Sequence, residues 1–267
     1  MKNSDEKENS HAENFFNEKI FSHEEETKKN PRERAIKAKE NPHAGHRERL
    51  RKKFIANGFE NFAEHEVLEF LLFYCYPQRN TNDIAHRMIK KFGTLHNLFE
   101  TDVETLMSTL EISENVAVLL NLIPKIAKKY FLGRWGAGLI VDDEKIAGEY
   151  LIDLFLGETT EKFYMLCLDM NYKLINAALV SEGTINETNV FPREIIAVAL
   201  RNNASFVILS HNHPSGTLEP SRADNELTRR LVEISEPLSI QIIDHIVVSG
   251  DKYFSYAARR KHVRGYF

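Results

Sequence analysis

Four side chains that can bind or assist a metal ion lie within fourteen residues of one another: His211, His213, Ser221 and Asp224. The apolar run 206–210 precedes them and predicts a buried strand. If the strand continues to His213, both histidines point to one face, because side chains alternate along a strand. A turn containing proline and glycine follows, so a helix that begins near Ser221 would bring Asp224 back towards the histidines.

Two imidazoles and one carboxylate are a ligand set that suits zinc, and three protein ligands leave the fourth coordination position open for water. Zinc lowers the pKa of such a water to about 7, which supplies hydroxide at neutral pH. A neighbouring carboxylate is then needed to accept the proton and return it. The residues therefore predict one zinc ion (Zn2+) per chain at His211, His213 and Asp224, and they predict hydrolysis as the chemistry.

Each half of this pattern also has an ordinary structural explanation. A His-x-His pair alone is a weak sign of a metal site, and residues 221–224 have the spacing of a helix capping box. The two halves together, with Pro214 and the loop between them, favour a metal site. The contiguous letters His-Asn-His do not indicate the nuclease class of that name, because its three residues are spread along a ββα motif.

The rest of the chain divides into four segments by composition and periodicity. Residues 1–42 are rich in Glu, Lys, Asn and Ser and predict a disordered, charged tail. Residues 43–132 show helical periodicity and predict a small helical domain. Glycines cluster in 133–143 and indicate a linker. In 144–267, helix and strand patterns alternate, which predicts a mixed α/β domain.

Composition excludes several classes of protein and site. The formal net charge of −4 argues against a nucleic-acid binder that is basic overall. The chain has only two cysteines, Cys75 and Cys167, both in apolar runs, so we expect reduced, buried thiols and no thiolate zinc site. No segment approaches the ~18 consecutive apolar residues of a membrane span, and the N-terminus lacks a secretion signal. We therefore expect a cytoplasmic protein without a membrane partner.

The complete pattern resembles the JAB1/MPN (JAMM) metalloprotease motif, in which a glutamate precedes His-x-His-Pro-x6-Ser-x2-Asp. Segments 191–195, 208–216 and 244–248 are similar to sequences of the RadC family, a bacterial branch of that fold. The resemblance implies a JAB1/MPN-like mixed sheet with flanking helices and a zinc-dependent hydrolase of a peptide or isopeptide amide. It implies His211, His213 and Asp224 as the zinc ligands, and Ser221 as the hydroxyl that supports the substrate carbonyl or its oxyanion.

The same resemblance implies an upstream glutamate as the general base. Glu161 matches by topological position, at the start of the strand that follows the first helix of the domain. Glu182 is closer to the histidines in sequence and stays open as the alternative. Glu194 lies on an expected helix face and is expected to be structural. His245, in an apolar strand, is expected to be a buried histidine beside the site or in the core rather than a ligand.

RadC-like proteins carry an N-terminal region that resembles a helix-hairpin-helix module, which binds the DNA backbone through a glycine-rich hairpin. The expected hairpin here, 110–117, has no glycine and contains two glutamates, so we expect a degenerate module. Basic runs at 47–53, 125–134 and 259–264 still allow a weak, salt-sensitive DNA contact.

The alternative function is therefore a nucleic-acid-associated repair or replication factor whose metal site is structural or vestigial. A metal-dependent nuclease ranks lower, because only one metal ion is accommodated. The sequence specifies neither the substrate nor an oligomeric state.

Overall fold

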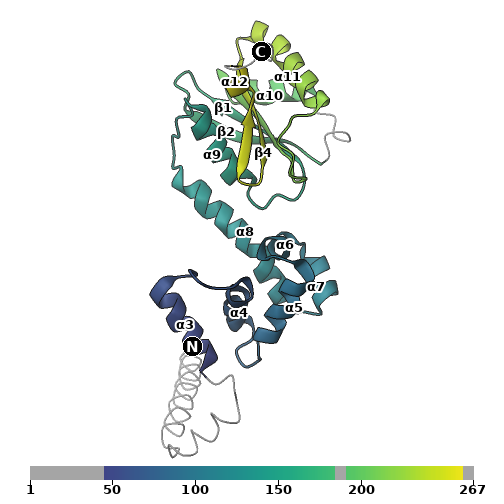
Figure 1. Cartoon of the computed structure of the whole chain (residues 1–267). Coiled ribbons are helices and arrows are strands. Elements are labelled where there is room, and N and C mark those ends of the chain that lie inside the picture. Colours follow the sequence, from purple (N-terminus) through teal and green to yellow (C-terminus); the bar gives the residue numbers. More distant parts are fainter. Residues whose placement is uncertain (1–44, 184–190, 261–267) are drawn as a thin grey trace, which may run out of the picture. The chain divides into compact units, whose positions relative to one another are not determined.

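The computed structural model describes residues 45–183 and 191–260, so the predicted tail at 1–42 lies outside the described residues (Figure 1). The chain forms two compact units, which divide between Ile89 and Lys90. Within the described residues, no helix is long and apolar enough to cross a membrane.

The first unit is built from helices α3 (His46–Asn57), α4 (Glu64–Cys75) and the beginning of α5 (Asn82–Phe92). One buried cluster of this unit consists of Leu50, Phe70 and Phe73, against which two further phenylalanines pack. Helix α3 ends before Gly58, whose φ of 61° suits a residue without a side chain.

Three helices open the second unit: α6 (Leu95–Glu100), α7 (Val103–Leu110) and α8 (Glu114–Arg134). The sequence did not indicate α6. A short turn joins α7 to α8 within the expected hairpin, and Glu111 adopts the left-handed conformation there, with φ 53°. A glutamate thus occupies a backbone position that favours glycine.

The rest of the second unit contains a five-stranded sheet in the order β2-β1-β3-β4-β5. Its strands are β1 (Lys162–Leu168), β2 (Leu174–Glu182), β3 (Phe206–Asn212), β4 (Gln241–Ser249) and β5 (Lys252–Ser255). The β3–β4 pair is parallel and the other pairs are antiparallel. The mixed sheet with flanking helices confirms the predicted fold class, although β5 had not been predicted.

Helices cover both faces of this sheet (Figure 1). They are α9 (Glu144–Phe155), α10 (Pro192–Arg201) and α11 (Arg222–Ser235), followed by a 3-10 turn (Glu236–Leu238) and, after β5, α12 (Tyr256–Arg260). Leu166 and Leu168 of β1 face the core beneath α9, whereas Met165 and Cys167 face the core beneath α10 and α11. The alternation along β1 thus divides the apolar residues between two cores. Cys167 is buried and free, as expected, and Cys75 is free but only half-buried.

Candidate metal centre

Strand β3 brings the two histidines to one face of the sheet. It continues past the predicted end to Asn212, with His211 paired to Phe163 on one side and to Val247 on the other. The amide of His213 donates to the carbonyl of Val248 at 2.8 Å, so the extended path includes His213. The Nε2 atoms of His211 and His213 lie 3.0 Å apart.

The capping box at the start of α11 positions Asp224. Ser221 Oγ accepts a hydrogen bond from the amide of Asp224 at 3.1 Å, and Asp224 Oδ2 accepts one from the amide of Ser221 at 2.7 Å. The other carboxylate oxygen, Oδ1, lies 3.5 Å from His211 Nε2. The capping box is therefore present, and it is compatible with the metal-site interpretation of residues 221–224, because each uses a different oxygen of one carboxylate.

The two ring nitrogens and Asp224 Oδ1 form a compact set of metal-ligating atoms. One ligand atom from each of the three residues lies within 4.8 Å of the other two, and both His211 and Asp224 are buried. Among the side chains that the structure describes, Asp224 Oδ1 is the one buried nitrogen or oxygen atom without a hydrogen-bond partner. Leaving such an atom unsatisfied costs about 1–3 kcal/mol, and more when it is charged. Zinc ligands at about 2.0–2.2 Å from the ion would satisfy this oxygen and fit the spacing of the three atoms.

The charge and proton positions in the cluster suit a cation. Burial alone would raise the pKa of Asp224, but His211 in its protonated form and the hydroxyl and amide of Ser221 lower this pKa well below its ordinary value. The aspartate is therefore ionised at neutral pH. His213 Nδ1 lies 2.8 Å from the carbonyl oxygen of Thr217, which only accepts, so this nitrogen donates and Nε2 keeps its lone pair.

Two further rings surround His211. The ring of Phe163 stacks on it with an interplanar angle of 4°, and His245 Nε2 lies 2.9 Å from His211 Nδ1. His245 is fully buried, as expected, and its Nδ1 lies 2.6 Å from the hydroxyl of Thr228. Burial lowers the pKa of His245 well below its usual value, because a charged imidazole loses its hydration there. The sequence analysis did not identify Thr228, although its place one helical turn after Asp224 was a usable signal.

The two candidate general bases adjoin neighbouring strands. Glu161 lies one residue before β1 and two residues before Phe163, whose ring stacks on His211. Glu182 pairs across the strands with Lys162 and forms an ion pair with it at 3.2 Å. Because side chains alternate along β1, Lys162 and therefore Glu182 point to the face opposite Phe163.

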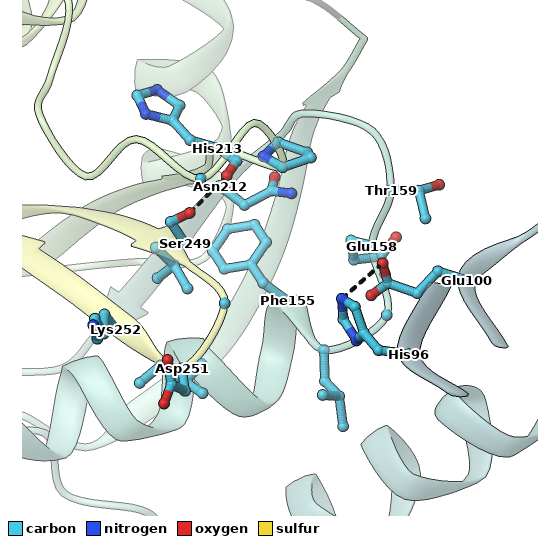
Figure 2. Close-up of a pocket in the computed structure, with 17 residues that line it drawn as sticks. His96, Glu100, Phe155, Glu158, Thr159, Asn212, His213, Ser249, Asp251 and Lys252 are labelled. Atoms are coloured by element: carbon cyan, nitrogen blue, oxygen red, sulfur yellow. Dashed lines mark hydrogen bonds and ion pairs between the residues drawn. The ribbon is translucent and has the colours of Figure 1, made fainter. Parts of the chain in front are cut away.

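A cavity of about 750 Å3 lies beside the end of β3 (Figure 2). Asn212 and His213 line it, as do Phe155 and Ser249. Figure 2 shows the ring of His213 turned away from Phe155, while the Ser249 hydroxyl donates to the carbonyl of His213 at 2.9 Å. The cavity therefore adjoins the C-terminal end of β3, but neither His211 nor Asp224 lines it.

Several residues of the basic runs have partners within the chain. Arg47 donates to the backbone carbonyls of Tyr76, Pro77 and Arg79. Lys53 pairs with Glu66 at 2.9 Å, and Lys128 pairs with Glu158 at 2.5 Å. The side chain of Arg260, with Lys261 and Arg264, lies outside the described residues.

Comparison with known proteins agrees with this geometry. The RadC-like JAB domain family matches residues 141–262. The UPF0758 protein FN0909 of Fusobacterium nucleatum is 34% identical over 224 residues, which cover 81% of this chain and 97% of that relative. The UPF0758 protein PSHAa2643 of Pseudoalteromonas translucida is 33% identical over 212 residues, covering 79% and 95% respectively. The JAB domain supports a relationship to JAMM-type hydrolases, and its histidine–aspartate cluster is compatible with a JAMM-type metal site. By these matches over nearly the full length of its relatives, the chain belongs to the RadC family.

Proposed function

We propose that this protein is a zinc-dependent hydrolase that cleaves a peptide or isopeptide amide bond. The observation that carries the proposal is the convergence of His211 Nε2, His213 Nε2 and Asp224 Oδ1, with the aspartate oxygen lacking a hydrogen-bond partner. When bound, zinc supplies a Lewis acid and lowers the pKa of a coordinated water to about 7. Three protein ligands leave room for that water and for the substrate carbonyl.

Glu161 is the general base in this proposal. It takes a proton from the attacking water and delivers a proton to the amine nitrogen as the C–N bond breaks. If the alternation of β1 continues one residue before the strand, Glu161 faces the histidines, which supports this role over Glu182, which is engaged with Lys162 on the opposite face.

Ser221 supports the substrate oxygen. It is exposed at the N-cap position just before α11, hydrogen-bonded to the buried Asp224. Because its Oγ accepts from the amide of Asp224, its own proton remains available to donate to the carbonyl oxygen as negative charge develops there.

The test uses the full-length protein loaded with zinc. We would incubate it with linear peptides and with isopeptides linked through lysine Nζ, and detect products by mass spectrometry. We expect cleavage by the wild type and by E182Q, and a loss of about 100-fold or more in E161Q at unchanged zinc content. A zinc-loaded wild type that cleaves neither class contradicts amide hydrolysis, and an E161Q variant as fast as E182Q contradicts the assignment of the base.

A further inference from the structure

We infer that Thr228 and His245 are positioning residues that hold His211 in the tautomer required of a metal ligand. The inference rests on the proposed metal centre and deepens it. It follows from a series of short contacts that runs from the backbone of Asp224 through Thr228 and His245 to His211.

The hydroxyl of Thr228 determines the direction of these hydrogen bonds. It lies 2.6 Å from the carbonyl oxygen of Asp224 and 2.6 Å from His245 Nδ1. A carbonyl oxygen only accepts, and a threonine hydroxyl has a single proton. Thr228 therefore donates to Asp224, and it accepts the proton that His245 carries on Nδ1.

The same reasoning continues through His245 to His211. The ring of His245 has no exposed surface, and its single proton is on Nδ1. Its Nε2 is then an acceptor, and it receives the proton of His211 Nδ1 across 2.9 Å. The proton of His211 is thus held on Nδ1, which leaves the lone pair of Nε2 directed at His213 and Asp224.

The opposite assignment of protons is unfavourable at the Thr228 end and incompatible with metal binding at the His211 end. It would leave the oxygens of Thr228 and Asp224 facing each other at 2.6 Å without a proton between them. It would also place a proton on His211 Nε2, where it would block the position of the metal. With the inferred assignment, the lone pairs of His211 and His213 face each other at 3.0 Å, an arrangement that a cation stabilises.

Asp224 therefore contributes to the centre twice. Its carboxylate is a ligand, and its backbone carbonyl, one helical turn before Thr228, is the acceptor on which the tautomer of His211 depends. Partners of this kind fix the orientation and tautomer of metal-binding histidines, and their loss typically weakens metal affinity 10–100-fold.

The first test compares zinc affinity, by competition with a chromogenic chelator, among wild type, T228V and T228S. Valine keeps the shape of threonine but has no hydroxyl, whereas serine keeps the hydroxyl. We expect zinc affinity to fall about 10–100-fold in T228V and to recover in T228S. Equal affinity in wild type and T228V would overturn the inference.

The second test does not depend on folding of a variant or on any cleavage activity. Long-range 15N–1H correlation spectra of the zinc-free wild type report which ring nitrogen of His211 carries the proton. We expect the proton on Nδ1 in wild type and T228S, and a shift towards Nε2 in T228V. A wild-type His211 protonated only on Nε2 would overturn the inference. Absence of cleavage with the expected tautomer would instead contradict only the proposed hydrolysis.

Discussion

The carboxylate of Asp224 shows how one residue can satisfy two sequence patterns. Its Oδ2 completes a capping box with Ser221, and its Oδ1 lies beside His211. The spacing of residues 221–224 predicts the capping box, but it cannot say that the second oxygen is buried without a hydrogen-bond partner. The surroundings of this oxygen depend on β3, a distant part of the chain, which places His211 3.5 Å from it.

Asp244, next to His245, gives a pH-dependent prediction at the residue scale. Burial raises its pKa to about 6 from 3.8, although Ser255, Ala257 and the amide of His245 donate to it. Because the folded pKa is the higher one, this residue's contribution to stability is fully present below pH 3.8 and is lost as the pH rises through 6.

The D244N variant does not titrate at this position and keeps most of these contacts. Its stability relative to wild type should therefore increase by about 3 kcal/mol from acidic to neutral pH, at 1.36 kcal/mol per pKa unit. Urea unfolding of both proteins from pH 3.5 to pH 7 measures this. A difference that stays constant with pH would contradict the prediction.

The choice between Glu161 and Glu182 illustrates what the sequence leaves open at this scale. Both glutamates adjoin predicted strands, and nothing in their local sequence tells which face each side chain occupies. The register of β1 against β2 and β3 gives the face for Glu182, because Lys162 pairs with Glu182 while Phe163 pairs with His211.

At the scale of elements, the packing of α9 against β5 depends on Gly148. A Cβ at this position would overlap the ring of Tyr253. G148A should therefore lower the free energy of unfolding by about 1–3 kcal/mol, despite the better helix propensity of alanine.

G133A in α8 is the matched control for G148A. A Cβ at Gly133 meets nothing within 4 Å, so the helix propensity of alanine should raise stability by about 1 kcal/mol. Thermal and urea unfolding of both variants check the pair. Equal effects of the two substitutions would show that the contact with Tyr253 does not constrain α9.

Apolar periodicity predicted most helices and strands of the described residues, but it missed elements whose residues lack a clear pattern. α6 spans only Leu95–Glu100, and β5 only Lys252–Ser255, which is too short for alternation to be evident. Strand β3 extends beyond its apolar run because His211 and Asn212 are buried polar residues that continue the ladder with β4. The apolar pattern of β3 therefore ends at residue 210, just before His211, which belongs to the candidate metal centre.

At the scale of the whole molecule, metal binding should stabilise the fold. The ligands come from β3 and α11, so their shared ion would link two elements that unfolding separates. Zinc at a free concentration 100 times its Kd should add about 2.7 kcal/mol to the free energy of unfolding. Differential scanning calorimetry with and without zinc measures the effect, which should diminish at pH 5 because protons compete for the histidine ligands.

The H213A variant is the control for this stabilisation. Its melting temperature should not respond to zinc, because one ligand is missing. A wild-type protein whose melting temperature is the same with and without zinc would contradict a folded-state metal site, and an equal response in H213A would place the ion elsewhere.

The most direct test of the metal centre is the zinc stoichiometry of purified wild type beside D224N after equilibrium dialysis. In D224N, the side-chain oxygen of asparagine can keep the capping box with Ser221, while its uncharged NH2 group replaces the charged oxygen beside His211. The E182Q variant controls for the loss of an unrelated carboxylate. The account predicts one zinc per chain in wild type and E182Q and its loss from D224N. Equal zinc in D224N and wild type, or none in wild type, would contradict it.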